Sequence, residues 1–197
     1  MRVPAAVALL LLALLPPSAR AADSEPIPLP DGQPWRHEPS GFVFPPDVGT
    51  FTRAGASRYD EHGRNVSVAY TDAALRVLVT AYVYPNAGHP LAGHFEQVKR
   101  DVLEVHPEAR LLGQGVWKLE QGDRTLTGRR AAFTFRVSAN GREHDVVSEA
   151  YLLREGEHFI KFRVTCPKPR FEAAADRVGR FLRALKVPQV APAAAGK

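Results

Sequence analysis

The sequence has little of three things: cysteine, long apolar runs and recognisable catalytic motifs. Cys166 is the one cysteine among 197 residues, so no intramolecular disulfide can form and the domain must be held together by its core. Cys166 ends an apolar stretch and precedes Pro167, which is typical of a buried small hydrophobic side chain. An intermolecular disulfide is the alternative. No cofactor-binding or redox pair is therefore built on cysteine.

The longest apolar run covers residues 5–15, which is far short of the ~20 residues that a membrane-spanning helix needs. Arg2 precedes this run, Pro16 and Pro17 follow it, and Ala19–Ala21 supplies small residues for signal peptidase. A positive start, a short apolar core and a small-x-small site define a secretory signal peptide. We expect cleavage near residue 21 and export to the periplasm, or secretion, with no transmembrane segment in the mature chain.

Catalytic and metal-binding signatures are missing. There is no Gly-x-Ser-x-Gly elbow, Gly-rich phosphate loop, His-Glu-x-x-His or Cys-x-x-Cys. The seven histidines lack the tight, repeated spacing of zinc ligands; His89 with His94, and His144 with His158, are the pairs that could approach each other. We expect neither metal nor cofactor. The formal net charge of +5 is mild, and no nucleic-acid partner is predicted.

Composition divides the chain into four segments. Residues 1–21 are the signal peptide, 22–40 a proline-rich arm or linker with Trp35 as its docking point, 41–187 a single α+β domain, and 188–197 a disordered tail. Within the domain, period-two stretches predict strands and period-three-and-four stretches predict two amphipathic helices. The first helix carries Leu91, Phe95, Val98, Val102 and Val105 on one face; the second carries Phe171, Ala174, Ala175, Val178, Phe181, Leu182 and Leu185.

Two hairpins join the long strands of the second half. Asn140-Gly141 separates two alternating runs and is a strong signal for a two-residue loop, which places Phe135 opposite Val146 and Arg136 opposite Asp145.

The second hairpin turns near residues 155–157. A three-residue loop would place Leu152 opposite Ile160, Glu149 opposite Arg163 and Tyr151 opposite Lys161. A two-residue loop would instead oppose Leu152 and Phe159, with Lys161 and Arg163 on the core face. We favour the first register because it keeps both cations off the core.

Tight turns between most strands predict an antiparallel meander sheet of about six or seven strands packed with two helices. This order of elements resembles the PsbP-like fold, named for an extrinsic protein of photosystem II. The strings Gly41–Pro45, Arg58–Asp60, Val66–Tyr70 and Thr80–Pro85 are similar to small exported proteobacterial proteins of unassigned function. The resemblance implies an α+β fold over roughly 41–187 and carries over no metal or photosystem role.

A polar sheet face is the candidate binding site. In the favoured register it gathers Arg136, Asp145, Glu149, Lys161 and Arg163. The alternatives are a docking surface for an anionic ligand or an envelope protein, a solvated face of weak ion pairs, and a face that the second helix covers. The sequence thus favours a non-catalytic binding or accessory module of the cell envelope. An enzyme of unknown class and a structural, oligomer-forming protein are the other readings.

Overall fold

The computed structural model describes residues 24–139 and 141–189. The predicted signal peptide and most of the predicted tail lie outside these ranges. The elements are β1 (Glu25–Pro26), β2 (Trp35–His37), β3 (Phe42–Phe44), β4 (Asp47–Val48), β5 (Phe51–Arg58), β6 (Val66–Asp72), β7 (Val77–Pro85), α2 (Leu91–Val105), β8 (Arg110–Gln121), β9 (Arg124–Ala139), β10 (Arg142–Glu155), β11 (His158–Pro167) and α3 (Phe171–Ala184).

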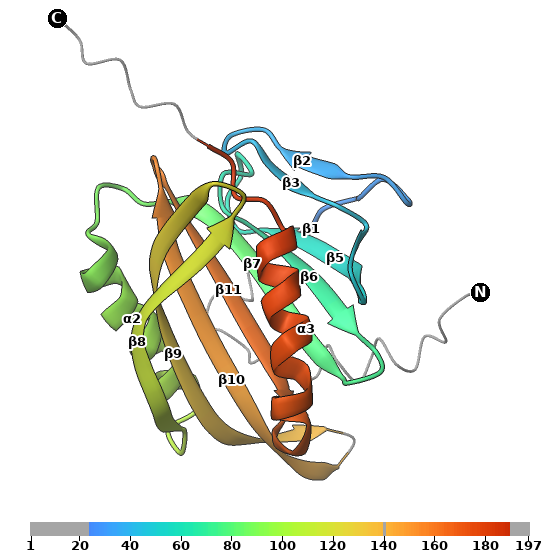
Figure 1. The fold of residues 1–197 in the computed structure, drawn as a ribbon, viewed down its shortest axis with the longest axis vertical. Coiled ribbons are helices and arrows are strands. Elements are labelled where there is room, and N and C mark those ends of the chain that lie inside the picture. Colours follow the sequence, from blue (N-terminus) through green and yellow to red (C-terminus); the bar gives the residue numbers. More distant parts are fainter. Residues whose placement is uncertain (1–23, 140, 190–197) are drawn as a thin grey trace, which may run out of the picture.

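One large sheet dominates the molecule (Figure 1). Its strand order is β1-β5-β6-β7-β11-β10-β9-β8, with β4 also paired to β5, and β2 and β3 form a separate two-stranded sheet. Every pairing is antiparallel. The predicted α+β class is confirmed, but the sheet has nine strands. The prediction of six or seven was too low, in part because β1 and β4 are only two residues long, too short to show a hydrophobic period.

The two helices cover opposite faces of this sheet. α3 packs its apolar stripe on a core that includes Phe42, Phe51, Tyr70 and Phe162, and Figure 1 shows it lying across the front of the sheet. α2 packs Phe95, Val98 and Val102 on the other face, over β9 and β10. Alternation along each strand therefore divides the apolar side chains between two separate cores.

The proline-rich arm contributes structure of its own. β1 pairs with β5, and β2 pairs with β3. Trp35 stacks on Phe44, with ring centroids 5.5 Å apart, so its predicted docking is confirmed. The Arg53 guanidinium donates to the carbonyl oxygens of Pro30 and Gln33, both at 2.9 Å. These contacts fix the arm beside the sheet.

The first hairpin has the predicted register: Phe135 lies opposite Val146, and Arg136 opposite Asp145. The second register is wrong. Glu155 pairs with His158, so Gly156 and Glu157 form a two-residue loop, and Gly156 takes a positive φ of 55°. Neither register considered above has this pairing, which shifts β11 by one residue from the favoured one.

The β8–β9 hairpin bends over the end of α3. Gln121 is buried there and donates its amide to the carbonyl oxygens of Leu182 and Leu185, at 3.1 and 2.9 Å. Gly128 allows β9 to approach β10 closely, because a Cβ atom at this position would lie 2.4 Å from the Leu152 carbonyl oxygen. The end of α3 is therefore capped by a side chain from a distant strand.

Cys166 is buried in the core beneath α3. Burial raises the pKa of its thiol to about 12, so the group stays protonated near neutral pH and acts as a small hydrophobic side chain. This burial also removes the thiol from contact with a second molecule. Among the described residues, no helix is long and apolar enough to cross a membrane.

Candidate binding surface

The five predicted site residues do not share one face. Arg136 and Asp145 lie opposite each other on the side that α3 covers, and both are partly or fully exposed to solvent; Glu149 lies on that same side but is buried. Lys161 pairs with Leu152 and Arg163 with Ala150, which places both cations on the α2 side. The one-residue shift of the second hairpin moved every β11 side chain to the other face.

Glu149 has a structural role in the core. Its carboxylate accepts a hydrogen bond from Arg130 Nε at 2.9 Å and another from the Tyr151 hydroxyl at 2.9 Å. Both donors are side chains of the same protein, so the buried Glu149 carboxylate is already hydrogen-bonded within the fold. This carboxylate is therefore not free to bind a ligand.

Lys161 and Arg163 are partly buried beside α2. The Lys161 ammonium lies 4.2 Å from the centroid of the Tyr82 ring, and burial, with Arg163 adding to it, lowers its pKa to about 8. Arg163 Nε donates to the Ser148 hydroxyl at 3.3 Å. A tyrosine ring can stabilise a lysine on a half-covered sheet face, which explains how these cations are tolerated there.

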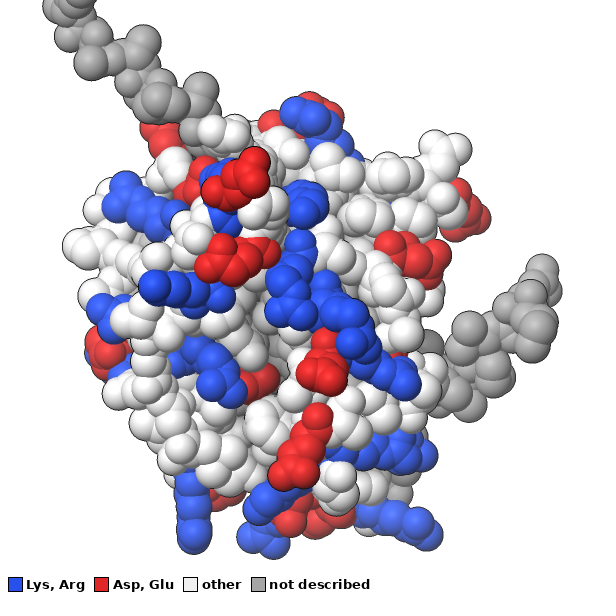
Figure 2. Space-filling view, viewed as in Figure 1, with Lys and Arg blue, Asp and Glu red and all other residues white. Residues whose placement is uncertain are grey.

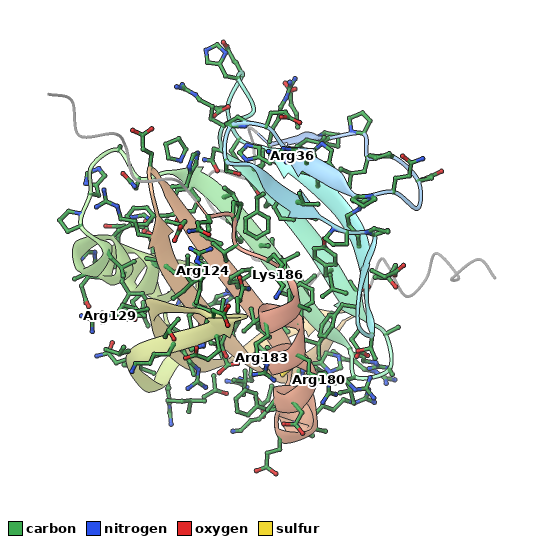
Figure 3. The ribbon with its side chains drawn as sticks, turned by 45° about the horizontal axis from the view of Figure 1, so that its top comes forward. Arg36, Arg124, Arg129, Arg180, Arg183 and Lys186 are labelled. Carbon is green, nitrogen blue, oxygen red and sulfur yellow. The ribbon has the colours of Figure 1, made fainter. Side chains whose placement is uncertain are left out.

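A different set of cations forms a charged surface on the α3 side of the molecule. It is made by Arg177, Arg180, Arg183 and Lys186 on and just after α3, together with Arg124 of β9 and Arg36 of β2. We call this set the α3 basic surface. Figure 2 shows its blue side chains gathered over α3. Figure 3 shows Arg180 and Arg183 along α3 and Lys186 just beyond its end, next to Arg124, which donates to the Val187 carbonyl oxygen at 3.2 Å.

Helical geometry creates this surface. Arg177, Arg180 and Arg183 follow one another at three-residue spacing, so they lie along one flank of α3, while Phe181 and Leu182 face the core. A Cβ atom at Gly179 would lie 3.5 Å from the Arg183 guanidinium, so this guanidinium folds back along the helix. The positive charges near the end of α3 also complement its dipole.

Some of these cations are already neutralised. Arg177 contacts the buried Asp72 carboxylate at 2.7 Å, and Arg124 contacts Glu155 at 2.8 Å. Burial alone would raise the pKa of Asp72, but hydrogen bonds from Thr50 and Arg177 outweigh it and lower that pKa. Arg177 is thus a structural anchor that also lies at the edge of the basic surface.

Arg180 and Arg183 have no such neutralisation, since within residues 24–139 and 141–189 no carboxylate forms an ion pair with either. Both side chains are exposed. They line a groove of about 440 Å³ between α3 and the turn at Gly49 and Thr50, and its lining residues include no thiol, imidazole or carboxylate. A guanidinium offers five N–H donors suited to carboxylate or phosphate oxygens, so this groove can bind an anionic group.

Two histidines form hydrogen bonds within the fold. His37 is buried and hydrogen-bonds the Ser40 hydroxyl at 2.6 Å and the Gly63 carbonyl at 2.8 Å. His94 hydrogen-bonds the Tyr84 hydroxyl at 2.7 Å. In the part of the chain that the structure describes, no three His, Cys, Asp or Glu residues gather in a way that could hold a metal ion.

Sequence reasoning missed the α3 basic surface as a site. Sequence reasoning considered only the apolar face of this helix, although the three-residue spacing of its arginines indicates a stripe along one flank. The contributions of β9 and β2 could not be placed from the sequence, because they depend on how distant strands meet around the end of α3.

Comparison with known proteins supports no assignment by sequence. No family model and no curated protein matches the chain. Among solved structures, the chain is similar to the solution structure of cyanobacterial PsbP (CyanoP) from Synechocystis sp. PCC 6803, with 12% sequence identity and a TM-score of 0.49, over 79% of this chain and 92% of that one.

Proposed function

We propose that this protein is an exported, non-catalytic accessory module of the cell envelope that binds an acidic partner protein through the α3 basic surface. The observation that carries the proposal is the pair Arg180 and Arg183, exposed in a groove where no described carboxylate neutralises them. Exposed cations in a concave surface attract and orient anionic partners. The signal-like segment at residues 1–21 supports the periplasmic location.

The chemistry of the described residues agrees with binding rather than catalysis. The one thiol is buried with a raised pKa; His94 and His106 stack on aromatic rings, and His37 bonds a backbone carbonyl. The basic surface contributes guanidinium and ammonium groups, which are donors with no acceptor capacity. Such groups hold a carboxylate or phosphate in place but transfer no proton near neutral pH.

The binding proposal is tested with the double charge reversal Arg180→Glu/Arg183→Glu. Fluorescent poly-L-glutamate serves as the probe of acidic partners, and its affinity is measured by anisotropy at several salt concentrations. We expect the reversal to weaken binding by at least about tenfold, and binding to the unaltered protein to fall as salt rises. Both side chains are exposed, so thermal unfolding should change little.

The matched control is Arg64→Glu/Arg142→Glu, which makes the same charge change at two exposed arginines outside the basic surface. Equal weakening by both double variants would show that net charge alone attracts the probe, and the proposal would fail. Export is tested separately: the mass of the protein recovered from the periplasmic fraction should lack about 21 N-terminal residues. An intact N-terminus in that fraction would contradict cleavage.

A further inference from the structure

β8 is an unpaired edge of the large sheet. It ends the strand order and pairs with β9 alone among the described strands. Arg110–Gln121 is a long strand, and within residues 24–139 and 141–189 no strand covers its outer backbone N–H and C=O groups. Such an edge is a template for another strand unless charges, proline or a bulge block it. β8 has no proline, and its bulge lies at one end, between Leu111 and Gly113.

The edge also carries unusual apolar exposure. Leu111, Leu112 and Val116 are 47%, 56% and 62% exposed. Gly113 and Gly115 lie among them, and no atom of another described part of the molecule approaches within 4 Å of a Cβ position at either glycine. The backbone is therefore accessible between three large apolar side chains. Clusters of this kind on a folded domain indicate an interaction surface.

The charges around β8 select the partner. Arg110 and Lys118 are both exposed at the two ends of this apolar stretch. In an antiparallel pair of two β8 strands, the register that places Leu112 opposite Val116 also places Arg110 opposite Lys118. Like charges directly opposite each other are destabilising. A second copy in this register is therefore disfavoured, and a strand with an apolar centre and acidic residues opposite Arg110 and Lys118 complements this edge.

We propose that β8 binds an extended segment of the acidic partner as an additional antiparallel strand, with apolar side chains in the middle and Asp or Glu at both ends. This inference deepens the proposed function and rests on it. Main-chain hydrogen bonds supply affinity in such strand addition, and alternate side chains supply specificity. The α3 basic surface would then attract the partner, and β8 would fix its register.

The test uses a synthetic strand peptide, acetyl-Glu-Glu-Val-Thr-Val-Thr-Val-Glu-Glu-amide, and the same peptide with lysine in place of glutamate. We expect the acidic peptide to bind at least about tenfold more tightly than the lysine peptide. Its binding should slow hydrogen exchange at β8 amides and leave the amides of α3 unchanged. Equal binding of both peptides, or no protection of β8, would overturn the inference.

A variant pair locates the contact. Leu111→Ser/Val116→Ser removes two exposed apolar side chains from β8, while Leu103→Ser removes one exposed apolar side chain, 43% exposed, from α2. The β8 variant should bind the acidic peptide about tenfold more weakly, and the α2 variant should bind it with unchanged affinity. Equal affinity of the β8 variant and the unaltered protein would contradict the inference.

Two further measurements separate the alternatives. If sedimentation shows a dimer that Leu111→Ser/Val116→Ser dissociates, a second copy occupies the edge and the inference is wrong; we expect a monomer. Arg180→Glu/Arg183→Glu should weaken the binding of poly-L-glutamate but not the binding of the short peptide. If the peptide does not bind as expected but poly-L-glutamate does, strand addition at β8 is rejected while the proposed function of the α3 basic surface is retained.

Discussion

The two helices are fixed to opposite faces of the same sheet by different chemistry. α3 is held by apolar contacts: the Phe181 ring lies between Phe51 and Tyr70, with centroid distances of 4.8 and 5.1 Å. α2 buries three apolar side chains, but imidazole rings lie near both of its ends. His94 stacks on Phe159 at 4.3 Å, and His106 stacks on Phe135 at 3.9 Å. Only the second arrangement depends on groups that titrate near neutral pH.

The polar contacts repeat this difference. α3 is tied to the sheet by the Gln121 amide and by the Arg177–Asp72 pair, neither of which changes protonation between pH 5 and pH 8. α2 is tied by a hydrogen bond between His94 Nε2 and the Tyr84 hydroxyl. The comparison teaches that one sheet can carry a helix whose attachment is constant across mild pH and another whose attachment is not.

The largest effect is expected at the apolar anchor of α3. Phe181→Ala should lower the free energy of unfolding by about 3–5 kcal/mol, because it leaves a cavity among rings that are themselves fully buried. Phe95→Ala, the matched change on α2, should cost less because its core is smaller. Urea unfolding of both variants measures this, and an equal or larger cost for Phe95→Ala would contradict the comparison.

A smaller loss is expected at the polar anchor of α3. Asp72 is 1% exposed and accepts from Arg177, Thr50 and the Leu75 amide. Asp72→Asn should lower the free energy of unfolding by about 2 kcal/mol at neutral pH, as expected for the loss of hydrogen bonds to a charged group. Glu120→Gln, on an exposed carboxylate that bonds a nearby threonine, is the control and should cost less than about 0.5 kcal/mol.

The pH dependence of that loss follows from the sign of the pKa shift. The pKa of Asp72 is lowered in the fold from its ordinary 3.8, so its stabilisation is present above this value and is lost as pH falls through the folded pKa. The difference between the unaltered protein and Asp72→Asn should therefore shrink in strong acid. A difference that stays constant down to about pH 2 would show that the amide substitution perturbs packing instead.

The hairpins show how far the sequence specifies the sheet. Asn140-Gly141 allows one tight loop type, and the register that follows from it is correct. The turn at Gly156 offers no such constraint, and the favoured register was chosen to keep Lys161 and Arg163 off a covered face. That argument fails because the Tyr82 ring accepts the Lys161 ammonium. A cation–aromatic contact between β7 and β11 cannot be anticipated before the strand order is known.

The α3 basic surface could be predicted from the sequence only in part. Both helices and their apolar faces follow from spacing alone, so the stripe of arginines along α3 was within reach of the sequence. The sequence could not show which of these arginines are neutralised by a carboxylate. Arg177 pairs with Asp72 across 105 residues, whereas the neighbouring Arg180 has no such pair among the described residues, and this difference depends on where β6 ends beside α3.

The smallest effect, and the sharpest test of the comparison, concerns pH and α2. Burial lowers the pKa of His94 below its ordinary 6.5; nearby Lys161 lowers it further, and Asp101 opposes the shift. Burial also lowers the pKa of His106, with Arg163 acting in the same direction and Glu108 against it. The unfolded chain therefore binds more protons at these sites, so stability must fall as pH drops below about 6.5.

Hydrogen exchange at about pH 7.5 and pH 5, corrected for the intrinsic rate, resolves this loss by element. Amides of α2 should lose protection at the lower pH relative to those of α3, because protonating either imidazole places a new cation beside Lys161 or Arg163. His106→Phe keeps an aromatic ring over Phe135 and removes one titrating group, so it should reduce the pH effect at the end of α2. Arg183 makes no ring contact with the described strands, and Arg183→Gln should leave the pH effect unchanged. Equal loss of protection in α2 and α3 would mean that global unfolding, driven also by the lowered pKa values of His37 and His158, precedes any local release of α2.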